Sequence, residues 1–267
     1  MPSDATSNRS GLAPSVWIAD PNGCPAPDEI DAALSSVGLT DPRPVLVLVG
    51  GAANLSEAVA PALLKLFERI APQLDALGAA VIDGGTAFGV MALMGRARRG
   101  TDARFPLIGI APQGAVAIGT VKSEQPIGKD GKDGKDGKDG KDGKVRLDVD
   151  HTHFILVPGD GWGDESPWIS AVADRLARGR GTLMLVAAGG EITRLDVMHR
   201  LRTGGRVLVL AGSGGIADRL ADWRRDGGSL PDVDVDVGEA ERDLIEVSDL
   251  ADAHETLPAL AEQALAR

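Results

Sequence analysis

The feature that most constrains this chain is an alternation, from Pro44 onward, between short apolar runs and longer stretches of helical period. The apolar runs, rich in β-branched residues, are Val45–Val49, Ala79–Ile82, Pro106–Ile110, Phe154–Val157, Thr182–Ala187 and Arg206–Leu210. The helical stretches are Ser56–Leu77, Thr86–Arg99, Ser166–Arg178, Ile192–Arg202 and Gly214–Arg225. This alternation is typical of parallel βαβ units, and continuously apolar strands fit a sheet covered on both faces. The sequence therefore predicts an α/β fold with a doubly wound, mostly parallel sheet and helices on both faces.

The composition also divides the chain. The polar residues 1–14 predict a disordered leader, which ends near a first strand candidate at Val16–Ala19. We expect residues 15–227 to form one ligand-binding domain and the acidic residues 228–267 to pack on it as a C-terminal extension.

Two polar segments need separate interpretation. Five Gly-Lys-Asp triplets and a final Gly-Lys occupy residues 128–144. Because a collagen helix needs three chains and is normally supported by proline, we interpret this segment as a disordered loop that extends a surface hairpin. Asp232, Asp234 and Asp236 alternate with valines, which predicts a charged edge strand or, alternatively, ligands for a hard cation such as calcium.

Charge and cysteine content exclude several classes of function. The net charge of −11 opposes broad capture of nucleic acid or of an anionic membrane, so an anionic ligand must be bound locally. The single cysteine, Cys24, can form no intramolecular disulfide. The longest apolar run is too short to span a bilayer. We therefore expect a cytoplasmic protein that does not enter the membrane.

Glycines recur where the predicted strands end. They stand at Gly50-Gly51, Gly84-Gly85, Gly189-Gly190 and Gly212 with Gly214-Gly215. At the carboxyl edge of an α/β sheet, such turns let a phosphate approach the backbone, and the following helices point free N–H groups at it. Each pair alone is better explained by a tight turn, but recurrence at one edge favours a phosphate-binding rim.

Neighbouring residues extend the predicted site. Thr86 and Ser213 are placed to cap their helices and to donate hydroxyl hydrogen bonds to a phosphate, and Gly114 can add a further backbone wall. Arg194 lies early in the helix after Gly190. The turns match neither the dinucleotide fingerprint nor a Walker-type loop, which disfavours a standard dehydrogenase or P-loop ATPase.

His151 and His153 flank Thr152 just before an apolar run. Strand alternation would place both histidines on one face, where they can bind a ligand, support the fold or contribute to a metal site. Since no third and fourth ligands stand at a recognisable spacing, we predict no metal and no cofactor. We assign His153 to the ligand-binding group.

Five blocks, taken in order, resemble one known family. They are Val-Gly-Gly-Ala-Ala-Asn at 49–54, Ile-Asp-Gly-Gly-Thr-Ala-Phe-Gly-Val-Met at 82–91, Ile-Gly-Ile-Ala-Pro-Gln-Gly at 108–114, His-Thr-His-Phe-Ile-Leu-Val at 151–157 and Gly-Ser-Gly-Gly-Ile-Ala-Asp at 212–218. The chain resembles the N-terminal cytosolic region of melastatin-type transient receptor potential (TRPM) channels, which belongs to the SLOG superfamily (the LSDAT family). The likeness extends over most of the chain, from about Trp17 to Trp223.

This resemblance implies a Rossmann-like SLOG fold that senses a nucleotide-derived ligand such as ADP-ribose or cyclic ADP-ribose. Carried over to this sequence, the ligand-contacting residues are Gly50, Gly51, Ala52, Asn54, Gly84, Gly85, Thr86, Gly89, Gly189, Gly190, Gly212, Ser213 and Gly214. Two features depart from the channels. Gly215 stands where they usually have Arg, and the chain has no tyrosine, so Trp162 or Phe88 is the available aromatic for stacking on a base.

Three function classes follow. The first is a sensor, which implies an effector protein that reads the bound state and, from the superfamily, self-association as a homodimer. The second is a nucleoside monophosphate N-glycosidase of the lonely-guy type, but the corresponding motif is broken at residues 188–196, where Asp196 only roughly replaces the family's glutamate. The third is a single-stranded DNA-binding module, which the acidic charge opposes. We favour binding over catalysis and assign no catalytic residue.

Overall fold

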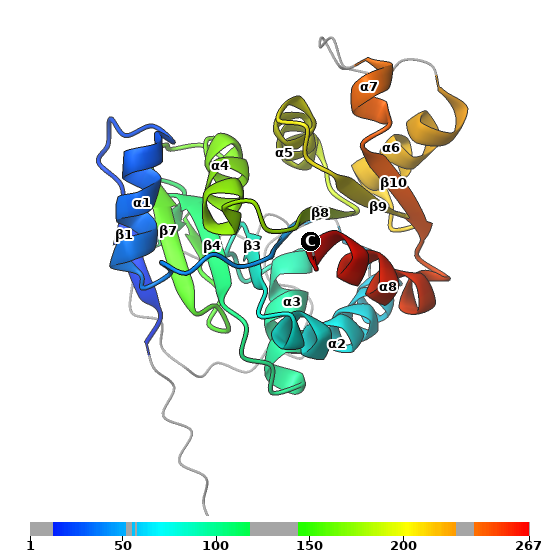
Figure 1. Ribbon diagram of the computed structural model, residues 1–267, viewed down its shortest axis with the longest axis horizontal. Coiled ribbons are helices and arrows are strands. Elements are labelled where there is room, and N and C mark those ends of the chain that lie inside the picture. The colour runs from blue at the N-terminus through cyan, green and yellow to red at the C-terminus, as the bar shows by residue number, and fades with distance from the viewer. Residues whose placement is uncertain (1–12, 52–54, 57, 118–143, 228–237, 267) are drawn as a thin grey trace, which may run out of the picture.

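The computed structural model describes residues 13–51, 55–56, 58–117, 144–227 and 238–266. Within them, one parallel sheet has the strand order β1-β7-β4-β3-β2-β8-β9-β10 (Figure 1). Its strands are β1 (Ser15–Ile18), β2 (Val45–Gly50), β3 (Ala80–Asp83), β4 (Leu107–Pro112), β7 (His153–Val157), β8 (Thr182–Ala187), β9 (Val207–Ala211) and β10 (Ile245–Asp249). The helices are α1 (Pro27–Ser36), α2 (Ala60–Ala76), α3 (Gly89–Gly100), α4 (Ser166–Ala177), α5 (Glu191–Arg202), α6 (Gly215–Asp226), α7 (Glu239–Arg242) and α8 (Ala253–Leu265). The predicted α/β, doubly wound, parallel fold is confirmed.

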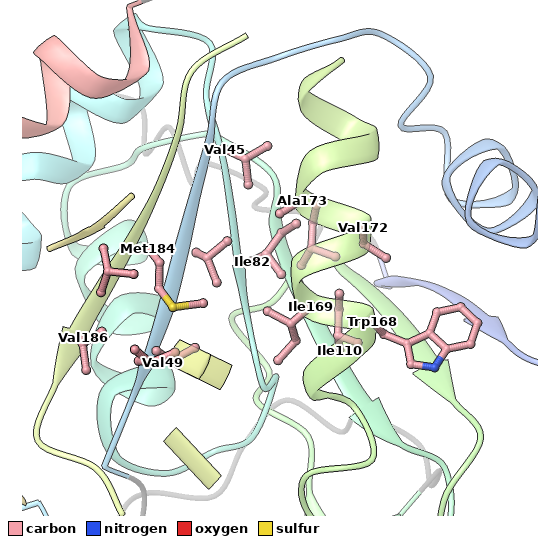
Figure 2. Close-up of a cluster of buried hydrophobic side chains, with 14 of the residues drawn as sticks. Val45, Val49, Ile82, Ile110, Trp168, Ile169, Val172, Ala173, Met184 and Val186 are labelled. Carbon is pink, nitrogen blue, oxygen red and sulfur yellow. The ribbon is translucent and has the colours of Figure 1, made fainter. Parts of the chain in front are cut away.

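Two apolar cores lie on the two faces of this sheet. Val45, Val47 and Val49 of β2 join the core covered by α1, α4, α5 and α6, whereas Leu46 and Leu48 join the core covered by α2, α3 and α8. Figure 2 shows the first core, where α4 packs its apolar side chains against the strands. Because strand residues alternate between faces, burial on both faces requires the continuous apolar runs that the sequence shows.

The chain reverses its direction of growth at β2. From β2 it adds β3, β4 and β7 on one side and then crosses back to place β8 on the other side. Gly50 pairs with Ala187, so β2 and β8 end at the same level. In open α/β sheets, such a reversal leaves a crevice outside the carboxyl ends of the two strands, and ligands bind there.

Two predicted features differ in the structure. The strands β5 (Val116–Ala117) and β6 (Val145–Arg146) pair in parallel, so they are not the two arms of a hairpin, and that prediction is wrong. The Gly-Lys-Asp repeat itself lies outside the described residues except for Lys144, as do Asp232, Asp234 and Asp236. Among the described strands, β1 and β10 stand at the two ends of the sheet. In the described part of the chain, no helix is long and apolar enough to cross a membrane.

Candidate functional site

The turns after β8 and β9 are hydrogen-bonded into one unit at the carboxyl edge of the sheet. The N–H groups of Ile216 and Ala217 donate to the carbonyls of Gly189 and Ala188, at 3.0 and 3.1 Å. The N–H of Ala188 donates to the hydroxyl of Ser213 at 2.8 Å. These contacts fix the first turn of α6 against the switch point between β2 and β8.

Three predicted glycines face open space at this edge. A Cβ atom built on Gly84, Gly190 or Gly214 would have no heavy atom within 4 Å. Gly190 and Gly214 are also the residues that precede α5 and α6, and neither helix has a side-chain cap there. The positive end of the α5 dipole is therefore exposed at the carboxyl edge of the sheet, which suits an anionic ligand group.

Five other predicted glycines are explained by close packing. A Cβ built on Gly50 would lie 2.1 Å from the carbonyl oxygen of Ala187. A Cβ built on Gly189 would lie 2.4 Å from the hydroxyl oxygen of Thr193. Gly51 abuts the same turn, Gly85 abuts Gly109 and Phe154, and Gly114 abuts Gly159 and Asp160. For these positions, the tight-turn alternative is the one that the contacts support.

Gly215, where the related channels usually have Arg, belongs to this packed group. Its φ is +61°, and a Cβ would stand 2.2 Å from the carbonyl oxygen of Gly189. No side chain fits this position without moving the β8 turn. The departure from the channels therefore has a steric cause in this backbone.

The predicted helix-capping roles of Thr86 and Ser213 are wrong. Phe88 and Gly214 occupy the capping positions of α3 and α6. Thr86 instead forms an isolated antiparallel bridge with Leu147. The Ser213 hydroxyl donates to the Leu210 carbonyl at 2.5 Å, so its proton is already used inside the fold.

Of the remaining predicted residues, Gly89, Gly212 and Arg194 lie at the carboxyl edge of the sheet, and His153 does not. Gly89 begins α3, and the N–H of Gly212 donates to the Asp218 carboxylate at 2.7 Å. Arg194 is nearly buried and forms an ion pair with Glu191 at the start of α5. His153 begins β7, at the amino edge of the sheet and away from the glycine turns. Ala52 and Asn54 lie outside the described residues.

His151 does not share a face with His153, because it lies outside β7 in the preceding turn. Its Nε2 is 2.8 Å from Asp83 Oδ1, and its Nδ1 is 2.9 Å from Asp148 Oδ2. Burial opposes protonation, but the two carboxylates outweigh it and raise the pKa of His151 to about 9. The imidazole is therefore a buried cation whose two nitrogens are both engaged, which leaves none for a metal.

Two acidic residues come together where the start of α4 lies next to α5. Glu165 precedes α4, Asp196 lies in α5, and both are buried. Burial raises the pKa of Glu165 to about 7 and the pKa of Asp196 to about 8, where the charge of Glu165 acts in the same direction. The Ser166 hydroxyl opposes this rise in the pKa of Asp196, and the buried Ser170 hydroxyl has no hydrogen-bond partner among the described residues. No pattern in the sequence predicts that these two acids converge.

The loop between β7 and α4 reaches the region of Glu165 and Asp196. A Cβ built on Gly163 would lie 3.3 Å from the terminal carbons of Ile192 and Leu195 in α5. Its neighbour Trp162 keeps 40% of its surface exposed. The exposed indole of Trp162, one residue before this contact, is available for stacking on a planar group.

The chain was compared with known families and structures. Residues 43–257 match the family described as SLOG in TRPM, prokaryote. Similar solved structures include TM1055, a structural-genomics target, at 19% identity, with 82% of this chain and 99% of that chain covered and a TM-score of 0.49. They also include the molybdenum cofactor binding protein from Rippkaea orientalis, at 12% identity, 82% and 97% coverage and a TM-score of 0.49. The molybdenum cofactor carrier protein from Chlamydomonas reinhardtii has 14% identity, 84% and 99% coverage and a TM-score of 0.48. No curated protein matches the sequence.

Proposed function

The chain belongs to the family described as SLOG in TRPM, prokaryote, and from this premise we propose that its carboxyl sheet edge binds a nucleotide-derived small molecule such as ADP-ribose or cyclic ADP-ribose. The observation that carries the proposal is the open side of three glycine turns, at Gly84, Gly190 and Gly214. They follow β3, β8 and β9, on both sides of the switch point.

The chemistry of this edge fits a phosphorylated ligand. The phosphate would lie over Gly190, where backbone N–H groups and the α5 dipole attract negative charge without a lysine or arginine. This local attraction is needed because the protein as a whole carries a charge of −11. Trp162 would stack on the base. In this account the protein is a cytoplasmic sensor, and an effector protein reads its bound state.

Calorimetry with ADP-ribose, cyclic ADP-ribose and AMP tests the proposal. We expect at least one of them to bind more tightly than millimolar. We expect Gly190→Ala to weaken that binding, because its Cβ would enter the space assigned to the phosphate. Gly100→Ala, at the far end of α3, is the matched control and should bind as wild type does. Millimolar or weaker binding of all three ligands would refute the proposal for these compounds.

A specific observation also supports the second candidate, a nucleotide N-glycosidase. Glu165 and Asp196 have pKa values near 7 and near 8, so around neutral pH one carboxyl can donate a proton while the other accepts one. Release of free base from a nucleoside monophosphate, lost in Asp196→Ala, would support this activity. Base release that persists in that variant would assign it to other residues.

A further inference from the structure

A hollow lies at the carboxyl edge of the sheet, on the face covered by α2 and α8. It has a volume of about 540 Å³, within the usual range of small-molecule sites. Its walls come from the amino-terminal ends of α2 and α8 and from the ends of β9 and β10, and we call it the β9–β10 pocket. Gly84, Gly190 and Gly214 are not among its described lining residues, so the proposed nucleotide site leaves it unassigned.

The walls of the β9–β10 pocket are braced against one another. Arg69 of α2 donates from Nε to the His254 carbonyl of α8 at 2.7 Å. Gln73 of α2 donates to the Pro258 carbonyl at 2.8 Å. The N–H of Leu250 donates to the Ala211 carbonyl at 2.8 Å, which ties the end of β10 to the end of β9. The hollow is therefore preformed, which lowers the ordering cost of binding.

The walls of the pocket are mainly aliphatic. They include the side chains of Ala62, Leu66, Ala211 and Leu250. Leu66 and Ala211 are buried, and Leu250 packs against the apolar core on this face of the sheet. The described lining contains no Phe, Tyr or Trp, so a planar base finds no aromatic ring of the protein to stack on there. An aliphatic chain, which needs only apolar contact, matches these walls.

The mouth of the pocket carries one unpaired positive charge. Lys65 is exposed and has no ion-pair partner among the residues that the structure describes. The acid at the lip, Asp249, is paired with Arg225 at 2.9 Å. Within the described chain, the N–H groups of Ala251 and His254 donate to no acceptor, and they stand at the positive end of the α8 dipole. The mouth therefore suits a single negative charge.

We propose that the β9–β10 pocket is a second ligand site, separate from the proposed nucleotide site, and that it binds an aliphatic carboxylic acid. The chain of the acid lies against the alanine and leucine walls, and its carboxylate lies at the mouth, beside Lys65 and the first turn of α8. The two sites are independent, because α5 and α6 cover the other face of the sheet.

Calorimetry of the full chain with acetate, butanoate, hexanoate and octanoate tests this assignment. Each added CH₂ group that enters the hollow should tighten binding about fourfold, so octanoate should bind far more tightly than acetate. Octylamine has a chain of the same length and the opposite charge, and it should bind about tenfold more weakly than octanoate. Equal affinities for acetate and octanoate, or for octanoate and octylamine, would overturn the proposal.

Two substitutions probe the two halves of the ligand. Ala62→Trp places an indole in the hollow from an exposed position and should weaken octanoate binding about tenfold, and Lys65→Gln should weaken it about threefold. Ala240→Trp on α7 and Arg202→Gln at the amino edge are the matched controls and should not change it. Because Lys65→Gln alters only an exposed side chain, it keeps the test decisive if Ala62→Trp fails to fold. Unchanged octanoate binding in the folded pocket variants would place the acid elsewhere and overturn the assignment.

Competition separates this site from the nucleotide site. Saturating ADP-ribose should leave the affinity for octanoate unchanged. Displacement of octanoate by ADP-ribose would overturn the separate site and leave the proposed function standing. Failure of ADP-ribose to bind, with octanoate bound, would count against the proposed function alone. No binding of octanoate at millimolar concentration would sink the carboxylic-acid site alone.

Discussion

The Nε2 atom of His151 lies 2.8 Å from the Oδ1 atom of Asp83, and neither side chain is exposed to solvent. The same carboxylate oxygen accepts the N–H of Gly85 at 2.7 Å, and the carbonyl of Gly85 accepts the N–H of Asp148 at 2.9 Å. The buried cation thus holds the turn that ends β3, one of the three open turns of the candidate site.

Replacement of His151 should destabilise the fold strongly. His151→Gln leaves Asp83 and Asp148 as buried carboxylates without their cation, which costs about 3–5 kcal/mol of unfolding free energy. His153→Gln is the control, because His153 is only partly buried and hydrogen-bonds to its neighbour Thr152. Urea unfolding of the two variants measures the difference. Equal stabilities would show that the imidazole is not the partner that these carboxylates require.

The contribution of His151 should depend on pH. Its folded pKa of about 9 lies above the unfolded value of 6.5, so its stabilising effect is complete below pH 6.5 and is lost as the pH rises through 9. The difference in unfolding free energy between wild type and His151→Gln should therefore shrink from pH 6.5 to pH 9.5. A difference that stays constant over this range would mean that the imidazole is neutral in the fold.

Ionisation of Asp196 should lower the stability of the fold at high pH. Because its folded pKa is about 8 and an exposed aspartate titrates near 4, the wild type loses stability as the pH rises from 4 through 8. Asp196→Asn keeps the shape and cannot ionise, so its stability relative to wild type should increase between pH 5 and pH 9. Thermal unfolding at these two pH values measures this. A variant that is less stable than wild type at pH 9 would contradict the burial argument.

Two adjacent glycines should respond differently to the same methyl group. Gly84→Ala meets open space and should leave stability within about 0.5 kcal/mol of wild type. In Gly85→Ala the Cβ would lie 2.8 Å from the Cα of Gly109, at a φ of +68°, and overpacking of this kind costs about 1–3 kcal/mol. Melting temperatures of the pair give the comparison. If Gly84→Ala proves the more damaging, the open side assigned to that turn is wrong.

The fold was predictable because its strands and helices follow clear periods. The apolar run at Val45–Val49 and strand β2, for example, differ by one residue. Helix α1 is not among the predicted helices, although Pro27 and the acidic residues after it mark a helix start. Strand β10 was missed because its sequence, Ile-Glu-Val-Ser-Asp, mixes polar and apolar residues, as an edge strand can.

The site was predictable only in outline. Doubled glycines locate the carboxyl edge, but the sequence does not say which glycine of a pair faces the ligand and which packs on another turn. Position 85, for example, must be a glycine because a side chain there would collide with Gly109, which lies on the neighbouring strand. The contact between His151 and Asp83 joins residues 68 positions apart, and the meeting of Glu165 with Asp196 depends on how α4 and α5 pack. No local pattern encodes such contacts.

Amide hydrogen exchange of the full chain, with and without ADP-ribose, tests the central claim most directly. If the ligand lies over the strand-end turns, the amides of residues 188–191 and 212–215 should exchange more slowly in its presence, while those near Gly100 should not change. Protection confined to other parts of the chain, with ADP-ribose bound, would contradict the assignment of the site to this edge of the sheet.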